Sequence, residues 1–266
     1  MAFIKITEQE STHKDLDTKP VSELLIAMNN EDKLVALAIE SVLPKIELLV
    51  LDIVKQMKKG GRVFYIGAGT SGRLGVLDAS EIPPTFGVPN NLFNGIIAGG
   101  DYGLRHSIEH AEDDEHAAWE ELLKLGVSEQ DIIIGIAASG TTPFVIGALK
   151  QANSNGILTA SITCNPDSPI AELAHHRIEL ILGPEFVTGS TRLKAGSAQK
   201  MTLNMISTAT MIKLGRVKGN RMVNMKLVNA KLIDRGTRIL MQELHLDYDE
   251  AKQKLLIAGS VSNALK

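Results

Sequence analysis

The chain has a single cysteine, Cys164. One cysteine can form no disulfide within the chain, and no second cysteine stands at the spacing of a metal-binding pair. We expect Cys164 to be a small buried residue at a strand end and not a nucleophile. The sequence therefore excludes a fold stabilised by internal disulfides and a metal site formed by pairs of cysteines.

Long apolar runs and a strong net charge are also missing. No apolar run approaches the ~20 residues that span a membrane, and residues 1–15 contain no apolar signal region. A formal net charge of -3 is too small to indicate a nucleic-acid partner. We therefore expect a cytoplasmic protein with no membrane or nucleic-acid partner. Its 266 residues, 44% of them hydrophobic, suffice for the large core of an enzyme domain.

Helix-like and strand-like segments alternate along the chain. Helical periodicity comes first, over residues 21–28, 32–42 and 45–58. Strand-like runs follow at residues 62–66, 92–98, 131–137, 158–163 and 177–182. Helix-like stretches separate these runs, at residues 103–111, 114–125, 143–152 and 170–175. This alternation predicts an α/β fold that is doubly wound, with a mainly five-stranded parallel sheet flanked by helices.

The same pattern suggests three parts. Residues 1–58 are N-terminal helices packed on the core, residues 59–219 are the α/β domain, and residues 220–266 are a helical C-terminal extension. A helical apolar stripe late in the α/β domain predicts a core or dimer contact. Its members are Met201, Met205, Ile206, Ala209, Met211 and Ile212.

A glycine-rich segment follows the first strand-like run. Gly67, Gly69 and Gly72 match G-x-G-x-x-G, with Thr70 and Ser71 between them. A strand that ends in such a loop and opens a helix directs backbone N–H groups and a helix dipole at an anion. The segment predicts a phosphate-binding loop, and the alternative is a plain tight turn between strand and helix.

Two larger nucleotide motifs do not fit this segment. A dinucleotide fingerprint needs an acidic residue about 20 residues past the glycines, and Asp101 comes later than that. The Gly-Lys-Ser/Thr of a P-loop does not follow the glycines either. The loop therefore favours a phosphate on a molecule smaller than a dinucleotide.

A second polar loop follows the strand-like run at residues 131–137. It contains Ser139, Gly140, Thr141 and Thr142, and Pro143 is well placed as the first residue of the next helix. Ligands of open α/β sheets lie at the carboxyl ends of strands, so both loops could close on one small anionic ligand. The alternative for the second loop is helix capping by its hydroxyl groups.

Longer motifs surround the two loops and carry a family resemblance. They are Gly67-Ala68-Gly69-Thr70-Ser71-Gly72-Arg73-Leu74-Gly75, Asp78-Ala79-Ser80-Glu81, Pro83-Pro84-Thr85-Phe86-Gly87, Ala137-Ala138-Ser139-Gly140, Thr188-Gly189-Ser190-Thr191-Arg192 and Lys194-Ala195-Gly196-Ser197-Ala198-Gln199-Lys200. The loops resemble those of sugar-isomerase domains, which bind phosphosugars. The longer motifs are similar to those of the N-acetylmuramic acid 6-phosphate etherase family, from Thr7 to about Asn229. This chain has Thr141 where the family often has an arginine.

The resemblance implies a reaction. It is the release of D-lactate from N-acetylmuramic acid 6-phosphate, which leaves N-acetylglucosamine 6-phosphate, in the recycling or catabolism of cell-wall amino sugars. It also implies a homodimer, no metal, no cofactor and a small helical C-terminal domain, of which we expect residues 248–266 to be only the beginning.

The resemblance further implies two catalytic carboxyls. Glu81 would protonate the departing lactyl oxygen and then activate water, and Glu112 would help to move the C2 proton. A carboxyl in such a role needs a pKa near the working pH, which partial burial near another carboxylate can produce. Judged by composition alone, Glu81 is a solvated residue before Pro83 and Glu112 belongs to an exposed charged run.

The resemblance also implies the residues that hold the substrate and its phosphate. They are Gly69, Thr70, Ser71, Ser139, Gly140, Thr141, Thr142 and Lys194. Lys194 and Arg192 begin a long helical stretch, where they could contact the phosphate or the lactyl carboxylate. His106 and His110 are four apart, but a metal site would need a third ligand.

Two other functions stay open at this point. A non-catalytic phosphosugar sensor would need the two hydroxyl loops but no pair of acid and base, and the regulatory relative carries two copies of the domain. A sugar isomerase would share the phosphate site but not the Asp78-Ala79-Ser80-Glu81 motif.

Overall fold

The computed structural model describes residues 3–108 and 110–265. At its centre is a sheet of five parallel strands in the order β2-β1-β3-β4-β5. The strands are β1 (Val63–Gly67), β2 (Phe93–Ile97), β3 (Ile132–Ile136), β4 (Leu158–Thr163) and β5 (His176–Glu179). Each lies within or next to a predicted strand-like run, so the predicted fold class is confirmed.

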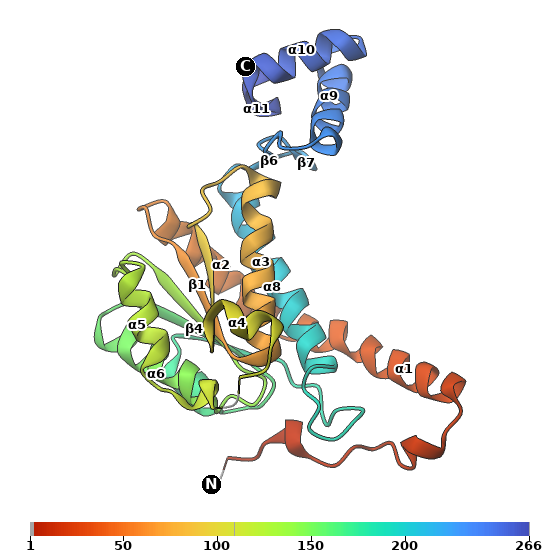
Figure 1. The fold of residues 1–266 in the computed structure, drawn as a ribbon, viewed down its shortest axis with the longest axis vertical. Coiled ribbons are helices and arrows are strands. Elements are labelled where there is room, and N and C mark those ends of the chain that lie inside the picture. Colours follow the sequence, from red (N-terminus) through yellow and green to blue (C-terminus); the bar gives the residue numbers. More distant parts are fainter. Residues whose placement is uncertain (1–2, 109, 266) are drawn as a thin grey trace.

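Helices cover both faces of the sheet (Figure 1). One face packs against α2 (Leu43–Met57), α3 (Gly69–Phe86) and α8 (Lys194–Lys213), and the C-terminal half of α1 (Val21–Glu40) joins the same core through Val35 and Ile39. The other face packs against α5 (Ala117–Lys124), α6 (Pro143–Ser154) and α7 (Pro169–Leu173). Side chains of β1 alternate between the two cores, because successive residues of a strand point to opposite faces. Cys164 is buried just after β4, as predicted.

The strand order reverses between β1 and β3. The chain passes from β1 outward to β2 on one side, and then returns to place β3 on the other side of β1. In the shared register, Gly67 at the end of β1 lies between Ile97 of β2 and Ile136 of β3. Ligands of open α/β sheets bind at such a switch point, outside the carboxyl ends of the strands. Both predicted loops begin at this point.

Two helix predictions differ from the structure. The predicted helices at residues 21–28 and 32–42 form one continuous helix, α1. The predicted helix at residues 103–111 is wrong: α4 (Gly100–Arg105) starts and ends earlier, and a single 3₁₀ turn (Ala111–Asp113) follows. His110 has a left-handed backbone, with φ 62°, which breaks the helical path. Glu109 of that predicted helix lies outside the described residues.

The C-terminal part forms a small unit of its own. A two-stranded hairpin, β6 (Val217–Lys218) with β7 (Arg221–Met222), leads into α9 (Ala230–Leu244), α10 (Tyr248–Ala258) and α11 (Val261–Ala264). These helices share a separate hydrophobic cluster and stand away from the sheet (Figure 1). The predicted boundary between residues 219 and 220 falls in the turn of the hairpin. Across residues 3–108 and 110–265, no helix has both the length and the apolar character that crossing a bilayer requires.

Candidate functional site

The first loop leaves the edge of the sheet and enters α3 within two residues. Gly72 approaches the end of β1 so closely that a Cβ there would lie 2.6 Å from the Gly67 carbonyl oxygen, which restricts the position to glycine. Gly69, the first residue of α3, has φ +51° and is exposed. The N-cap residue, Ala68, carries no side chain that could cap the helix, so the first N–H groups of α3 are free to meet an anion.

A cavity of about 450 Å³ opens at this helix terminus. The first loop contributes Ala68, Gly69 and Arg73 to its wall. The segment after β2 contributes the rest: Ala98, Gly103, His106, Ser107, Ile108, His110, Ala111, Glu112 and Asp113. The structure thus brings together the first predicted phosphate loop and Glu112. Glu112 is exposed, so its carboxyl is open to the cavity and to solvent.

Arg73 fixes the wall of this cavity. Its Nε donates to the carbonyl of Leu104, and its Nη2 donates to the carbonyl of Gly103, both at 2.9 Å. A longer bond of 3.4 Å reaches the carbonyl of His106. The planar guanidinium can satisfy several carbonyls at the end of α4 at once. Arg73 therefore holds the start of the segment that carries Glu112.

The second loop lies beside the first, because β1 and β3 are neighbours. Ser139 Oγ accepts from the backbone N–H and from Oγ1 of Thr141, both at 3.3 Å. Thr142 is the N-cap residue of α6, and within the described chain its hydroxyl makes no capping bond. Gly140 has φ +72°, and a Cβ there would meet Ser168 at 2.3 Å. The loop is therefore held in one shape, and the Thr142 hydroxyl can still turn to a ligand.

The N-terminal segment supports the second loop from behind. Thr7 and Asn165 exchange two hydrogen bonds, of 3.1 and 2.9 Å, and both residues are buried. The same amide of Asn165 donates to the carbonyls of Ala138 and Ser139 at 3.1 and 3.0 Å. Residues far apart in the sequence thus set the position of the second loop.

Lys194 lies in a different environment from the one we expected. Its ammonium group is buried, forms an ion pair with Glu31 and donates to the carbonyl of Leu182 at 3.1 Å. Burial tends to raise the pKa of Glu31, but the bonds from Lys194 and His13 outweigh it and lower that pKa. Lys194 therefore ties α8 to α1, and this geometry gives no support to a substrate contact.

The N-terminus of α8 already has an anion. Buried Glu185 accepts the backbone N–H groups of Lys194 and Ala195, at 3.0 and 2.9 Å. The carboxylate fills the position that a phosphate or a lactyl group could otherwise occupy.

Glu81 is not brought to the cavity within one chain. It is an exposed residue of α3, twelve positions past Gly69. At the helical rise of 1.5 Å per residue, that separation is about 18 Å. A sugar phosphate held at Gly69 therefore lies out of reach of Glu81 in the same chain.

The motif at residues 67–75 packs directly against the motif at residues 194–200. Gly196, in the first turn of α8, faces Thr70, where a Cβ would meet the threonine methyl at 3.3 Å. One turn later, Ser71 Oγ donates to Gln199 Oε1 at 2.9 Å. Ser71 is 8% exposed and Gln199 is 1% exposed. Gln199 therefore contacts Ser71, one of the predicted phosphate-binding residues, from the α8 side.

Asp78 is a buried carboxyl behind the cavity wall. It accepts from Tyr65 (3.1 Å), Asn204 (2.7 Å) and Ser207 (3.1 Å). Burial raises its pKa, and the three hydrogen bonds oppose that rise in part. Asp78 joins β1, α3 and α8 and lines none of the cavities described here, so its role in the Asp78-Ala79-Ser80-Glu81 motif is structural.

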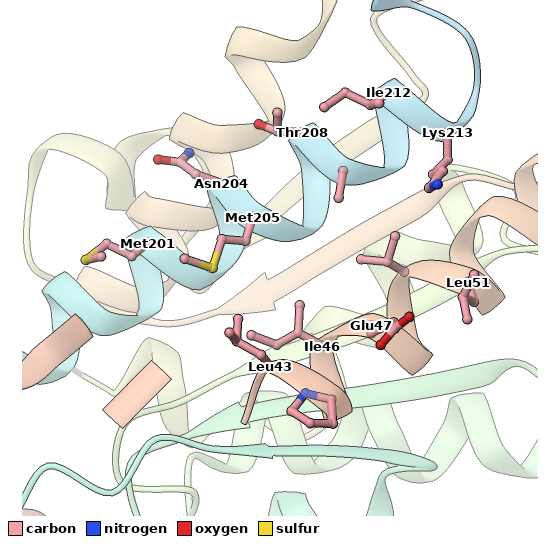
Figure 2. A pocket seen from close by; sticks show the side chains of 13 residues that line it. Leu43, Ile46, Glu47, Leu51, Met201, Asn204, Met205, Thr208, Ile212 and Lys213 are labelled. Atoms are coloured by element: carbon pink, nitrogen blue, oxygen red, sulfur yellow. The ribbon is translucent and has the colours of Figure 1, made fainter. Parts of the chain in front are cut away.

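A larger hollow of about 870 Å³ lies between α2 and α8 (Figure 2). Its wall is mostly apolar, with Leu43, Ile46 and Leu51 on α2 facing Met205 and Ile212 on α8. No glycine-rich loop borders it, and its charged residues are Glu47 and Lys213. This hollow suits an apolar partner better than a phosphosugar, so we place the candidate active site at the smaller cavity.

Pattern reasoning missed four residues that shape the site: Arg73, Asn165, Glu185 and Gln199. Arg73 and Gln199 stand inside recognised motifs, but the motifs give no sign of which group each side chain contacts. Asn165 and Glu185 lie outside every motif. The described residues contain no group of three or more His, Cys, Asp or Glu side chains arranged to hold a metal ion.

Comparisons with known proteins agree with the fold. The family model of the SIS domain matches residues 110–209, and that of the glucokinase regulatory protein N-terminal SIS domain matches residues 45–153. A phosphoheptose isomerase from Francisella tularensis has a similar structure, with a TM-score of 0.56 at 16% identity, over 73% of this chain and all of that one (100%). At this identity the likeness supports the fold alone.

Curated relatives are much more similar in sequence. The N-acetylmuramic acid 6-phosphate etherase of Bacteroides thetaiotaomicron is 60% identical over 266 residues, 100% of this chain and 96% of the relative. That of Porphyromonas gingivalis is 60% identical over 259 residues, 97% of this chain and 94% of the relative. The chain belongs to the N-acetylmuramic acid 6-phosphate etherase family.

Proposed function

We propose that this protein cleaves the D-lactyl ether of N-acetylmuramic acid 6-phosphate, a carbon–oxygen lyase reaction that yields N-acetylglucosamine 6-phosphate and D-lactate. The observation that carries the proposal is 60% identity to an etherase over the whole chain. The cavity agrees with it, because one wall is a helix N-terminus suited to phosphate and the other presents the carboxyl of Glu112. A non-catalytic phosphosugar sensor would have no need for the carboxyl of Glu112 in that second wall.

The chemistry follows from the opened sugar. With the ring open, C1 is an aldehyde and the proton at C2 is acidic. A base removes that proton, an acid protonates the ether oxygen at C3, and D-lactate leaves with the electrons of the broken C3–O bond. Water then adds at C3 of the unsaturated aldehyde, a proton returns to C2 and the ring closes. Two carboxyls supply these transfers without a redox change.

We assign the phosphate to the two loops at the switch point. The free N–H groups at Gly69 and Thr70, with the hydroxyl of Ser71, would hold it from α3. Ser139, Gly140, Thr141 and Thr142 would hold it from the neighbouring loop. Lys194 is left out, because its partners are Glu31 and Leu182. Such a site holds one end of the sugar and leaves C2 and C3 free to face the glutamates.

Glu112 would move the C2 proton, since it lines the same cavity as Gly69. Glu81 would have to reach the substrate from a second copy of the chain, because about 18 Å of helix separates it from Gly69. We therefore propose a homodimer in which Glu81 of one copy serves the cavity of the other. Closing the cavity in this way would also cover the two glutamates, which are exposed in one chain.

Uncovered apolar side chains support association. On α1, Val21, Leu25, Ile26 and Leu37 are each at least 60% exposed, and α1 extends away from the sheet (Figure 1). The apolar hollow between α2 and α8 is a second uncovered surface on the same chain (Figure 2). Exposed apolar surface on this scale is typical of a protein–protein contact. The predicted apolar stripe of α8 has two parts: Ile206 and Met211 are buried in the core, and the other members line the hollow.

We further propose that the enzyme acts in the cytoplasm. Its proposed substrate carries a phosphate, and a doubly charged sugar does not cross a bilayer unaided. The enzyme would therefore work in the compartment in which the sugar is phosphorylated.

The direct test is incubation of the protein with N-acetylmuramic acid 6-phosphate in water enriched in ¹⁸O and deuterium. Equal amounts of D-lactate and N-acetylglucosamine 6-phosphate are expected, with ¹⁸O at C3 and deuterium at C2 of the sugar. Binding without any D-lactate would favour the sensor. Solvent oxygen in the lactate in place of the sugar would contradict the elimination route.

A further inference from the structure

Gln199 is the buried amide behind the first phosphate loop. It sits one turn into α8, where Gly196 lets the helix pack against Thr70. Its Oε1 accepts the hydroxyl of Ser71 at 2.9 Å. Among the described residues, its Nε2 has no hydrogen-bond partner, although Gln199 is only 1% exposed. A buried amide N–H without a partner is rare in folded proteins and calls for a functional explanation.

The direction of the bond matters for phosphate binding. A phosphate offers only acceptors, so Ser71 can bind it only by donating its single hydroxyl hydrogen. In the structure that hydrogen is donated to Gln199 Oε1. A half-turn of the Gln199 amide exchanges its oxygen and nitrogen, and Nε2 then donates to Ser71 Oγ. The hydroxyl hydrogen becomes free to turn toward the N-terminus of α3.

We propose that Gln199 is a positioning residue for substrate phosphate: its amide turns when the phosphate enters, gives the unpaired N–H a partner in Ser71 and directs the Ser71 hydroxyl to the phosphate. This inference rests on the phosphosugar site proposed above. The turned arrangement leaves the amide oxygen without a partner in place of the amide N–H, and one hydrogen bond joins Gln199 to Ser71 in both arrangements. Gln199 itself touches no reacting atom.

A double-mutant cycle tests the inference. The variants are Ser71→Ala, Gln199→Met and the two combined, and the probe is N-acetylglucosamine 6-phosphate, titrated by calorimetry. Ser71→Ala should weaken binding by about tenfold, the loss of one hydrogen bond to a charged group. Gln199→Met should weaken binding by about threefold to tenfold. The combined variant should bind no more weakly than Ser71→Ala, because Gln199 acts only through Ser71.

Two results would overturn it: unchanged affinity in Gln199→Met, or effects of the two substitutions that add in the combined variant. Should Gln199→Met fold poorly, as judged by its thermal midpoint, Gln199→Glu serves the same purpose. An ionised carboxylate accepts from Ser71 but cannot donate, so Gln199→Glu should bind the probe more weakly than the parent and recover as the pH falls and the carboxyl gains a proton. Parent-like affinity at neutral pH in this variant would also contradict the proposal.

The double-mutant cycle and the D-lactate assay can fail independently of each other. If the parent releases D-lactate but the effects of the two substitutions on binding are additive, the role of Gln199 is contradicted and the etherase reaction stands. If the effects of the two substitutions are not additive but the parent releases no D-lactate, the role of Gln199 stands and the etherase reaction is contradicted. This is possible because the probe reports phosphate binding alone. In an active parent, Gln199→Met should raise KM and leave kcat nearly unchanged, whereas a general loss of structure would lower both kcat and the thermal midpoint.

Discussion

The carboxylate of Glu185 accepts the backbone N–H of Lys194 at 3.0 Å, so that the first turn of α8 is capped by an internal anion. A buried acceptor at a helix N-terminus gains from both the hydrogen bonds and the helix dipole. The motif that begins at Lys194 therefore stabilises the fold at its start, and its Gln199 would act on the proposed phosphate site.

Glu185→Gln should destabilise the protein, because the amide presents a donor where the helix presents N–H groups. We expect the free energy of unfolding to fall by about 1–3 kcal/mol, measured by urea denaturation. Glu120→Gln, at an exposed position of α5, is the control and should lie within about 0.5 kcal/mol of the parent. Equal stability of the two variants would rule out the capping role.

The ion pair of Glu31 with Lys194 should make stability depend on acid pH. The pKa of Glu31 is lowered in the folded chain below its ordinary value of 4.5. Its stabilisation is thus fully present above that value and is lost as the pH falls through the lower folded pKa. The stability difference between the parent and Glu31→Gln should be constant near pH 6 and shrink below about pH 4.5. A difference that grows on acidification would contradict this assignment.

Arg73→Lys should impair catalysis more than binding. Lysine lacks the planar fork with which the guanidinium bonds the carbonyls of Gly103 and Leu104 side by side, so the segment that carries Glu112 would be held less firmly. We expect kcat for D-lactate release to fall by about 10- to 100-fold, with a smaller change in the affinity for N-acetylglucosamine 6-phosphate. Arg105→Lys, an exposed arginine of α4, is the matched control. Equal kcat values for the two variants would remove Arg73 from the account.

A charge on the apolar face of α1 should break the proposed homodimer. Leu25 is 60% exposed in one chain, and Leu25→Lys would place an ammonium group in the proposed contact. Light scattering should report a dimer for the parent and a monomer for this variant. Ile257→Lys is the control, because Ile257 is 88% exposed on α10 and far from that face. A monomeric parent, or a dimeric Leu25→Lys, would contradict the proposed contact.

Much of the fold could be predicted from the sequence, because strands buried on both faces have a plain signal. The runs that form β1 and β3 are short, mostly apolar and followed by glycine- and hydroxyl-containing loops. The segment after β2 could not be predicted in this way. Its helical periodicity at residues 103–111 is overridden by Arg73, which takes the carbonyls at the end of α4 from a distant part of the chain.

The parts of the candidate site that depend on local backbone geometry could be predicted from the sequence. The parts that depend on side-chain contacts between distant segments could not. The glycines fix the first loop by local close approach, so Gly69 and Ser71 could be placed from the sequence. The contacts of Gln199 with Ser71 and of Lys194 with Glu31 join residues more than 100 positions apart. No local pattern encodes such pairs, and the spatial separation of Glu81 from the first loop follows only from the helix that joins them.

The most direct test of the central claim is D-lactate release by Glu81→Gln, by Glu112→Gln and by the two variants coexpressed in one cell. Each variant alone should lose about 10²- to 10⁴-fold in kcat while still binding N-acetylglucosamine 6-phosphate. In mixed dimers one cavity receives both intact glutamates, so the coexpressed sample should recover about a quarter of the parent activity. A mixture no more active than its parts would contradict the supply of Glu81 by the second chain, and full activity in either single variant would contradict the paired-carboxyl mechanism itself.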